Sequence, residues 1–177
     1  MSSRPTTPIR LATLTLSDTR TVADDASGRV LGELCAEAGF EVASHEVVRE
    51  EPELLRATVE RLLAEPGIDA IILTGGTGIS PRDRTIEALA PRFEKTVDGV
   101  GEAFRRLSWE EIGARAVLSR ATMGIARGRI VVALPGSPPA VRLGVTQLLA
   151  PMLAHAVGIA SGRATKHEHG HRGGARG

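Results

Sequence analysis

The chain has 177 residues, a length that accommodates one domain with a full hydrophobic core but not two of ordinary size. Hydrophobic residues make up 42% and charged residues 24%, the proportions of a folded globular protein and not of a disordered one. The formal net charge is +1 and aromatic residues make up only 2%, so the chain lacks both the positive field that attracts nucleic-acid backbones and the rings on which bases stack. We therefore expect no nucleic-acid partner.

Membrane and disulfide features are also missing from the sequence pattern. No apolar stretch approaches the roughly 20 residues of a membrane span, and the polar segment 2–7 lacks the apolar core of a signal peptide. We expect no membrane association and a cytoplasmic location. The single cysteine, Cys35, can form no intramolecular disulfide, and its apolar neighbours at helical spacing predict a core residue, not a catalytic thiol.

Strands and helices alternate in the first half of the chain. In order, the predicted elements are a strand over 11–16, a helix with apolar positions over 30–38, a strand over 40–48, a helix from Pro52 to Pro66-Gly67, and a strand over 68–74. The last of these runs is almost unbroken in its hydrophobicity, as is typical of a strand covered by helices on both faces. This order predicts a parallel, doubly wound sheet.

The second half is less regular. Its predicted elements are helices over 85–89 and 99–112, a hairpin of strands 121–126 and 129–134 joined across Arg127-Gly128, and a last helix over 141–153 that Pro151 kinks or restarts. The fold class that we expect is α/β: one domain with a doubly wound, mostly parallel sheet, helices on both of its faces and a small antiparallel hairpin.

We expect this domain to span residues 9–161, after a flexible N-terminus over 1–8. Residues 162–177 have no apolar period and predict a disordered tail rich in Gly, His and Arg. His167, His169 and His171 alternate in that tail and could share a metal ion. A flexible tail loses entropy on ordering and supplies no supporting hydrogen bonds, so we disfavour a physiological metal site there.

A glycine-rich loop, Thr74-Gly75-Gly76-Thr77-Gly78, leaves the end of the buried strand over 68–74. Glycines let the backbone approach an anion closely, and this loop lies at the strand ends where open α/β sheets bind ligands. The pattern is neither a P-loop nor the G-x-G-x-x-G dinucleotide motif. It suits a bound phosphate, although the same glycines could serve only to make a tight turn.

Asp83 follows this loop and has two interpretations. Ser80 as N-cap, Pro81 as first helical residue and Asp83 at the third position form an acceptable capping box, in which the carboxylate only stabilises a helix. A carboxylate next to a phosphate-type loop, between Arg82 and Arg84, is also how a magnesium–nucleotide site is often built. We favour the second.

Two further loops follow strands. The segment 134–138 leads into the last helix, with Ser137 a natural N-cap and Pro138 in the first turn. The segment 17–28 follows the first strand and is rich in hydroxyls and carboxylates. It could bind a polar ligand or simply turn and cap the next helix.

Together these loops resemble the MoaB/Mog family of molybdenum-cofactor biosynthesis proteins, with a leaning to the MoaB branch. The residues that carry the resemblance are Ser17-Asp18-Thr19-Arg20, Asp25-Ala26-Ser27-Gly28, Thr74 to Gly78 with Asp83, Val97 to Arg105, Ser119-Arg120 and Pro135-Gly136-Ser137-Pro138. Any one of these motifs is weak, but their order and spacing over residues 9–158 are specific.

The resemblance implies a molybdopterin-binding protein that assembles as a homotrimer or homohexamer and works with other molybdenum-cofactor biosynthesis proteins. In active members of the family, the terminal phosphate of molybdopterin attacks the α-phosphorus of Mg-ATP, which gives adenylylated molybdopterin and pyrophosphate. By this resemblance ATP is the co-substrate, molybdopterin the substrate and Mg²⁺ the metal.

The resemblance also implies roles for particular residues. Asp83 and Glu50 are the expected catalytic and Mg²⁺-binding residues, and the loop from Thr74 to Gly78 is expected to hold nucleotide phosphates. Ser119, Arg120 and Ser137 are expected on the pterin side. The full set expected to bind cofactor or substrate is Ser17, Asp18, Asp25, Ser27, Gly28, Thr74, Gly75, Gly76, Thr77, Gly78, Ser119, Arg120, Pro135, Gly136 and Ser137.

Glu50 departs from the adenylyltransferase pattern, which commonly has Asp at this position. The carboxylate here is one methylene longer, and magnesium geometry is demanding. One alternative is therefore a catalytically weak molybdopterin-binding paralogue that acts as a carrier or scaffold. Another is the related domain of competence-damage-type proteins, which the Ser119-Arg120 and Pro135-Gly136-Ser137-Pro138 stretches disfavour. Release of pyrophosphate from ATP that depends on molybdopterin separates an enzyme from a binding paralogue.

Overall fold

The computed structural model describes residues 8–163. Its sheet has six strands in the order β2-β1-β3-β6-β5-β4. The strands are β1 (Arg10–Leu16), β2 (Glu41–Val48), β3 (Ala70–Thr74), β4 (Lys95–Thr96), β5 (Thr122–Ala126) and β6 (Arg129–Leu134). The expected N-terminal segment and tail, with their three alternating histidines, lie almost entirely outside the described residues.

The helices largely follow the predicted pattern. They are α1 (Ala26–Glu37), α2 (Pro52–Ala64), α3 (Thr85–Leu89), α4 (Asp98–Ile112), α5 (Pro138–Leu143) and α6 (Ala150–Ala160), with 3₁₀ turns at Val22–Asp24, Ala90–Arg92 and Gly113–Leu118. Amphipathic spacing produces α1, α2 and α4, because each of these helices buries one apolar stripe against the sheet. The expected α/β fold is confirmed.

Strands β2, β1, β3 and β6 are parallel, while β5 pairs antiparallel with β6 and β4 pairs antiparallel with β5. The predicted hairpin is therefore present, and its second strand completes the parallel set. The turn uses positive φ at Arg127 (51°) and Gly128 (72°), as a tight two-residue hairpin requires. Strand β4 is too short to leave a sequence pattern and was not predicted.

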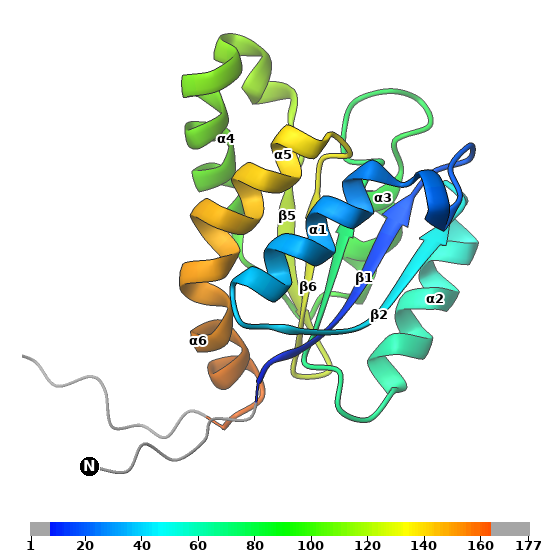
Figure 1. The fold of residues 1–177 in the computed structure, drawn as a ribbon, viewed down its shortest axis with the longest axis vertical. Coiled ribbons are helices and arrows are strands. Elements are labelled where there is room, and N and C mark those ends of the chain that lie inside the picture. The colour runs from blue at the N-terminus through cyan, green and yellow to red at the C-terminus, as the bar shows by residue number, and fades with distance from the viewer. Residues whose placement is uncertain (1–7, 164–177) are drawn as a thin grey trace, which may run out of the picture.

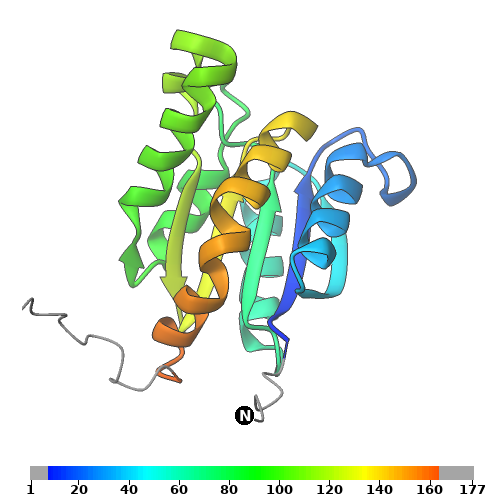
Figure 2. The same cartoon turned by 60° about the vertical axis from the view of Figure 1, so that its left-hand side comes forward.

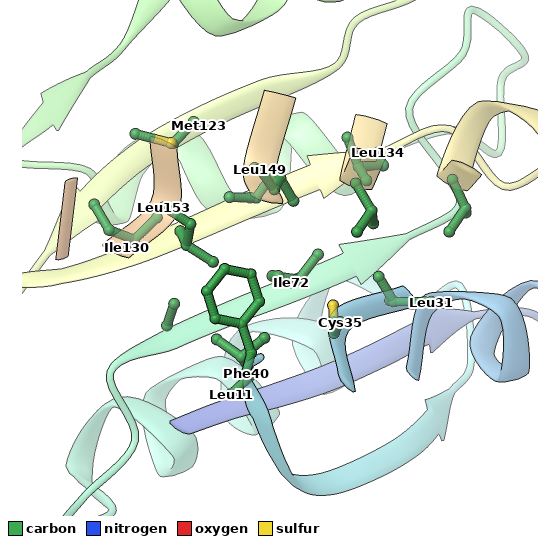
Figure 3. Packing of buried hydrophobic residues seen from close by; sticks show 14 of the residues in the cluster. Leu11, Leu31, Cys35, Phe40, Ile72, Met123, Ile130, Leu134, Leu149 and Leu153 are labelled. Carbon is green, nitrogen blue, oxygen red and sulfur yellow. The ribbon is translucent and has the colours of Figure 1, made fainter. Parts of the chain in front are cut away.

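The alternation of side chains along the strands divides the core between two faces. Residues 11, 72 and 132 belong to a cluster that packs under α1, α4, α5 and α6, whereas residues 14, 71 and 131 belong to a cluster under α2 and α3. Figures 1 and 2 show these two helical layers on either side of the sheet. Figure 3 shows the first cluster, in which Phe40 and Ile72 lie between Leu153 on one side and Cys35 on the other.

Cys35 is fully buried, which confirms the prediction of a core residue. Burial disfavours the charged thiolate and raises the pKa of this thiol to about 12. The side chain therefore stays a neutral, unreactive packing group at physiological pH.

The last helix accommodates Pro151 without breaking. A π-helical turn over Gly144–Leu149 joins α5 to α6, and Pro151 sits in the first turn of α6. The Ala150 N–H bonds to the Val145 carbonyl oxygen, five residues back, which is the hydrogen bond of a π-turn. The prediction that Pro151 kinks or restarts the helix is confirmed, because a π-turn precedes it and α6 begins at Ala150.

The continuous helix from Pro138 to Ala160 corrects the expectation that no apolar stretch approaches the length of a membrane span. Among residues 8–163, one helix, Pro138–Ala160, is long and apolar enough to cross a membrane by length and composition alone. Its buried positions recur every fourth residue, at 141, 145, 149, 153 and 157, and pack against the sheet. A helix that covers a sheet passes the same test of length and composition, and this helix is such a cover.

Candidate functional site

The four parallel strands end at one edge of the sheet, where β1 and β2 point in Figure 1. After β1 the chain continues to β2 at one end of the sheet, whereas after β3 it continues to β4 at the other end. The point between β1 and β3 is therefore the topological switch point, where such folds bind ligands. A cavity of about 490 Å³ lies there. Its walls are Leu16, Ser17, Thr19, Arg20, Glu50, Gly75, Gly76, Thr77, Gly78, Asp83, Ser119, Pro135, Gly136 and Ser137.

The glycine-rich loop forms one wall of this cavity and needs its glycines. Gly75 has φ 105° and Gly76 has φ 64°, conformations that L side chains rarely adopt. A Cβ on Gly75 would also lie 2.6 Å from the carbonyl oxygen of Leu16. Thr85 holds the turn because its hydroxyl donates to the Gly75 carbonyl oxygen (2.9 Å) and its N–H donates to the Gly76 carbonyl oxygen (3.1 Å). The loop is thus both a tight turn and a cavity wall.

The expected helix start at Ser80 is wrong. Residues 80–83 form a turn, closed by the Asp83 N–H donating to the Ser80 carbonyl oxygen at 2.9 Å, and α3 begins only at Thr85. Ser and Pro fit the first two positions of such a turn as well as they fit a helix start. The Asp83 carboxylate accepts the Ser80 N–H at 2.8 Å, so one contact of the predicted capping box is present without the helix.

Glu50, in the loop after β2, lines the same cavity as Asp83. Its pKa is raised above the ordinary value, first by burial and then by the negative charge of Asp83. Two negatively charged carboxylates that repel each other at the wall of one cavity favour a cation between them. Such a pair suits Mg²⁺, which is commonly held by one or two carboxylates together with substrate phosphates. In the part of the chain described here, no group of three or more potential metal ligands exists.

Asp18 does not line the cavity but joins the loops around it. One carboxylate oxygen accepts the Glu50 N–H at 3.0 Å, and the other forms an ion pair with Arg82. The residue therefore ties the loop after β1 to those that carry Glu50 and Asp83.

Asp25, Ser27 and Gly28, which were expected to bind cofactor or substrate, do not line the cavity. Asp25 caps α1 by accepting the Gly28 N–H at 2.8 Å, and its second oxygen contacts the His45 Nε2 at 2.9 Å. Burial acts to raise the pKa of Asp25, but the Thr15 hydroxyl, the Gly28 N–H and His45 together outweigh it, and the pKa is lowered. The Ser27 hydroxyl donates to the Gly136 carbonyl oxygen at 2.7 Å, which fixes α1 against the 135–137 loop.

Ser119 and Ser137 both line the cavity, whereas Thr74 and Arg120 do not. The Thr74 hydroxyl donates to the Pro135 carbonyl oxygen at 2.7 Å and links the glycine loop to the next one. Ser137 accepts the Ala140 N–H at 3.4 Å and caps α5, which confirms the predicted cap.

Three features of the site were not predicted. Thr19 and Arg20 line the cavity. Both belong to the motif Ser17-Asp18-Thr19-Arg20, but no role was predicted for either of them. His45 was missed because a lone histidine on a strand gives no sequence signal. Glu87 was missed because its partner, Arg120, is distant in the sequence.

The fold and the site define a single-domain α/β protein whose ligand cavity combines a glycine-rich loop with two carboxylates. Residues 12–155 match the family described as "Probable molybdopterin binding domain". The molybdenum cofactor biosynthesis protein B of Bacillus subtilis is 43% identical over 150 residues, which cover 84% of this chain and 88% of that protein.

Solved structures agree with this match. A crystal structure of molybdenum cofactor biosynthesis protein B superposes with a TM-score of 0.86 at 40% identity and covers 89% of this chain and 98% of that one. The tungsten cofactor synthesizing protein MoaB from Pyrococcus furiosus gives a TM-score of 0.77 at 34% identity, with 87% and 98% covered. The chain belongs to the MoaB/Mog family of molybdopterin-binding-domain proteins.

Proposed function

We propose that this protein acts in molybdenum-cofactor biosynthesis, where it binds molybdopterin and adenylylates it with Mg-ATP, releasing pyrophosphate. The observation that carries the proposal is the placing of Glu50 and Asp83 on the wall of the cavity formed by the glycine loop. The names of relatives about 40% identical over most of the chain support the pathway. A cytoplasmic location and contacts with other proteins of that pathway belong to the same proposal.

In the proposed reaction, a terminal phosphate oxygen of molybdopterin forms a bond to the α-phosphorus of ATP, and the bond from that phosphorus to the pyrophosphate group breaks. Such a transfer needs positioning and charge neutralisation more than covalent catalysis. The Thr74–Gly78 loop would hold nucleotide phosphates, and Ser119 and Ser137 would offer hydroxyls to molybdopterin. Mg²⁺ held by Asp83 and Glu50 would supply the positive charge that offsets the phosphates.

The competing proposal is a molybdopterin-binding paralogue without turnover, favoured by the longer carboxylate at Glu50. The deciding experiment measures pyrophosphate release from Mg-ATP with and without molybdopterin, alongside molybdopterin binding by fluorescence. Release that depends on molybdopterin supports the enzyme. Binding with no release in the presence of Mg-ATP would overturn adenylylation and leave the carrier.

Glu50→Gln is expected to lower turnover by about 10-fold, less than a change at Asp83, because a longer carboxylate fits magnesium geometry less well. The raised pKa of Glu50 means that the folded protein holds this proton more tightly than the unfolded chain does. Without metal, the stability of the wild type relative to Glu50→Gln therefore falls as pH rises from the ordinary pKa of 4.5 to the raised pKa of the folded protein, and it is constant above that. Denaturant titrations across this pH range check the sign, and a parallel pH dependence in both proteins would contradict it.

We also expect a symmetric homo-oligomer, a homotrimer that can pair into a homohexamer. Trp109 (52% exposed), Ile112 (46%), Val117 (59%) and Leu118 (49%) present apolar surface on α4 and the 3₁₀ turn after it. Uncovered apolar surface of this kind favours association, and cyclic symmetry closes the assembly. Light scattering coupled to size exclusion should give three or six times the chain mass of 18.6 kDa at micromolar concentration. A monomer there would refute the assembly.

A further inference from the structure

We infer that Arg120 is a positioning residue, which fixes the segment from Gly78 to Asp83 and thereby the Asp83 carboxylate, instead of binding molybdopterin itself. The catalytic consequence rests on the proposed function, because it requires that Asp83 take part in adenylylation. The structural part of the inference stands on the contacts of the Arg120 guanidinium alone.

Arg120 joins the two ends of this segment. Its Nε donates to the Gly78 carbonyl oxygen at 2.9 Å, and its Nη2 donates to the Asp83 carbonyl oxygen at 2.9 Å. The Arg120 N–H also donates to the Thr77 carbonyl oxygen at 3.2 Å. One planar group therefore sets the separation of Gly78, at the end of the glycine loop, from Asp83, which lines the cavity.

Glu87, near the start of α3, holds the same guanidinium from the other side. Nη1 of Arg120 pairs with one carboxylate oxygen of Glu87, and Nη2 donates to the other at 3.3 Å. The hydrogen bond from Arg120 is the largest of the effects that lower the pKa of Glu87. Because α3 follows the turn directly, this pair fixes Arg120 to the element that ends the loop.

The hydrogen-bonding capacity of Arg120 is almost fully used by these contacts. A guanidinium has five N–H donors, and the contacts to Gly78, Asp83 and Glu87 occupy four of them. The paired carboxylate also offsets its charge. Neither Arg120 nor Glu87 lines the cavity. A phosphate or pterin ligand would have to displace contacts that hold the loop in place.

The planar fork matters because lysine cannot reproduce it. An ammonium supplies the charge but cannot donate in one plane to two carbonyl oxygens and a carboxylate. Arg120→Lys should therefore free the turn and shift Asp83. A displacement of about 1 Å at a reacting centre costs about 100-fold in rate, so a loss between about 10- and 100-fold is expected.

The test compares wild type with Arg120→Lys, Glu87→Gln and the double variant, with Glu33→Gln on the exposed face of α1 as matched control. The readouts are the molybdopterin Kd by fluorescence, hydrogen exchange of the backbone N–H groups of Ile79, Ser80, Arg82 and Asp83, and the Mg²⁺ concentration that gives half-maximal turnover.

We expect Arg120→Lys to leave the molybdopterin Kd within about 2-fold, to speed exchange in the turn and to raise the Mg²⁺ requirement. Glu87→Gln should also speed exchange and raise the Mg²⁺ requirement, but by less than Arg120→Lys does. The double variant should differ little from Arg120→Lys in both readouts, because the two side chains act as one unit. Glu33→Gln should match wild type in every readout.

A molybdopterin Kd weakened about 10-fold or more by Arg120→Lys, with unchanged exchange in the turn, would overturn the inference and make Arg120 a ligand. Wild-type behaviour of Glu87→Gln would overturn the part assigned to that residue. If the wild type shows no turnover at all, the proposed function fails. The Kd and exchange measurements then still decide the role of Arg120, so the two failures are distinguishable.

Discussion

Asp83→Asn is expected to lower adenylylation by about two to three orders of magnitude while molybdopterin binding survives. Asparagine keeps the shape of the side chain and an oxygen that can accept the Ser80 N–H, a contact of 2.8 Å in the wild type. It removes the negative charge that would hold Mg²⁺ with Glu50. The turn should persist, so the free energy of unfolding should fall by no more than about 1 kcal/mol.

The measurement pairs initial rates of pyrophosphate release with molybdopterin Kd and denaturant unfolding. Asp98→Asn is the matched control, because Asp98 is an exposed carboxylate in the first turn of α4 and does not line the cavity. If Asp83→Asn turns over like the control, the carboxylate serves only to close the turn at Ser80. If the rate loss came with a fall of several kcal/mol in the free energy of unfolding, Asp83 would have a structural role and not a catalytic one.

Gly75→Ala should damage both stability and activity. A φ of 105° costs an L residue about 1–3 kcal/mol, and the new Cβ would lie 2.6 Å from the Leu16 carbonyl oxygen, which belongs to backbone and cannot rotate away. Relief requires the loop to move, which breaks the hydrogen bond of 3.0 Å from the Gly75 N–H to the Leu134 carbonyl oxygen. The folded fraction should therefore also lose nucleotide binding.

Gly32→Ala provides the contrast. Gly32 lies within α1, and a Cβ there meets nothing within 4 Å, so alanine should stabilise the protein by about 0.4–1 kcal/mol. Denaturant midpoints and ATP binding of both variants test the pair. Equal stability of Gly75→Ala and wild type would mean that the loop tolerates a side chain, and the argument for a glycine requirement would fail.

Much of the fold could be predicted because local sequence decides it. The apolar runs at β1 and β3, the helical spacing in α1 and α2, and the Arg127-Gly128 turn each carry their signal within a few residues of one another. The glycine loop was found in the same way, since adjacent glycines after a buried strand leave few other structures for the chain to adopt. Residue types that stand together in the sequence were therefore enough to locate the cavity.

Only the tertiary structure decided how the remaining groups are used. The Ser80–Asp83 segment suits a turn or a helix equally, and it is a turn in a structure where Thr85 bonds back to Gly76. The contact of Asp25 with His45 joins residues 20 apart, and the contact of Arg120 with Gly78 joins residues 42 apart. Such contacts form because strand order brings distant loops to one edge of the sheet. Their energies depend on geometry that no local pattern encodes, which is why nothing in the sequence indicated that Arg120 donates hydrogen bonds to Gly78 and Asp83.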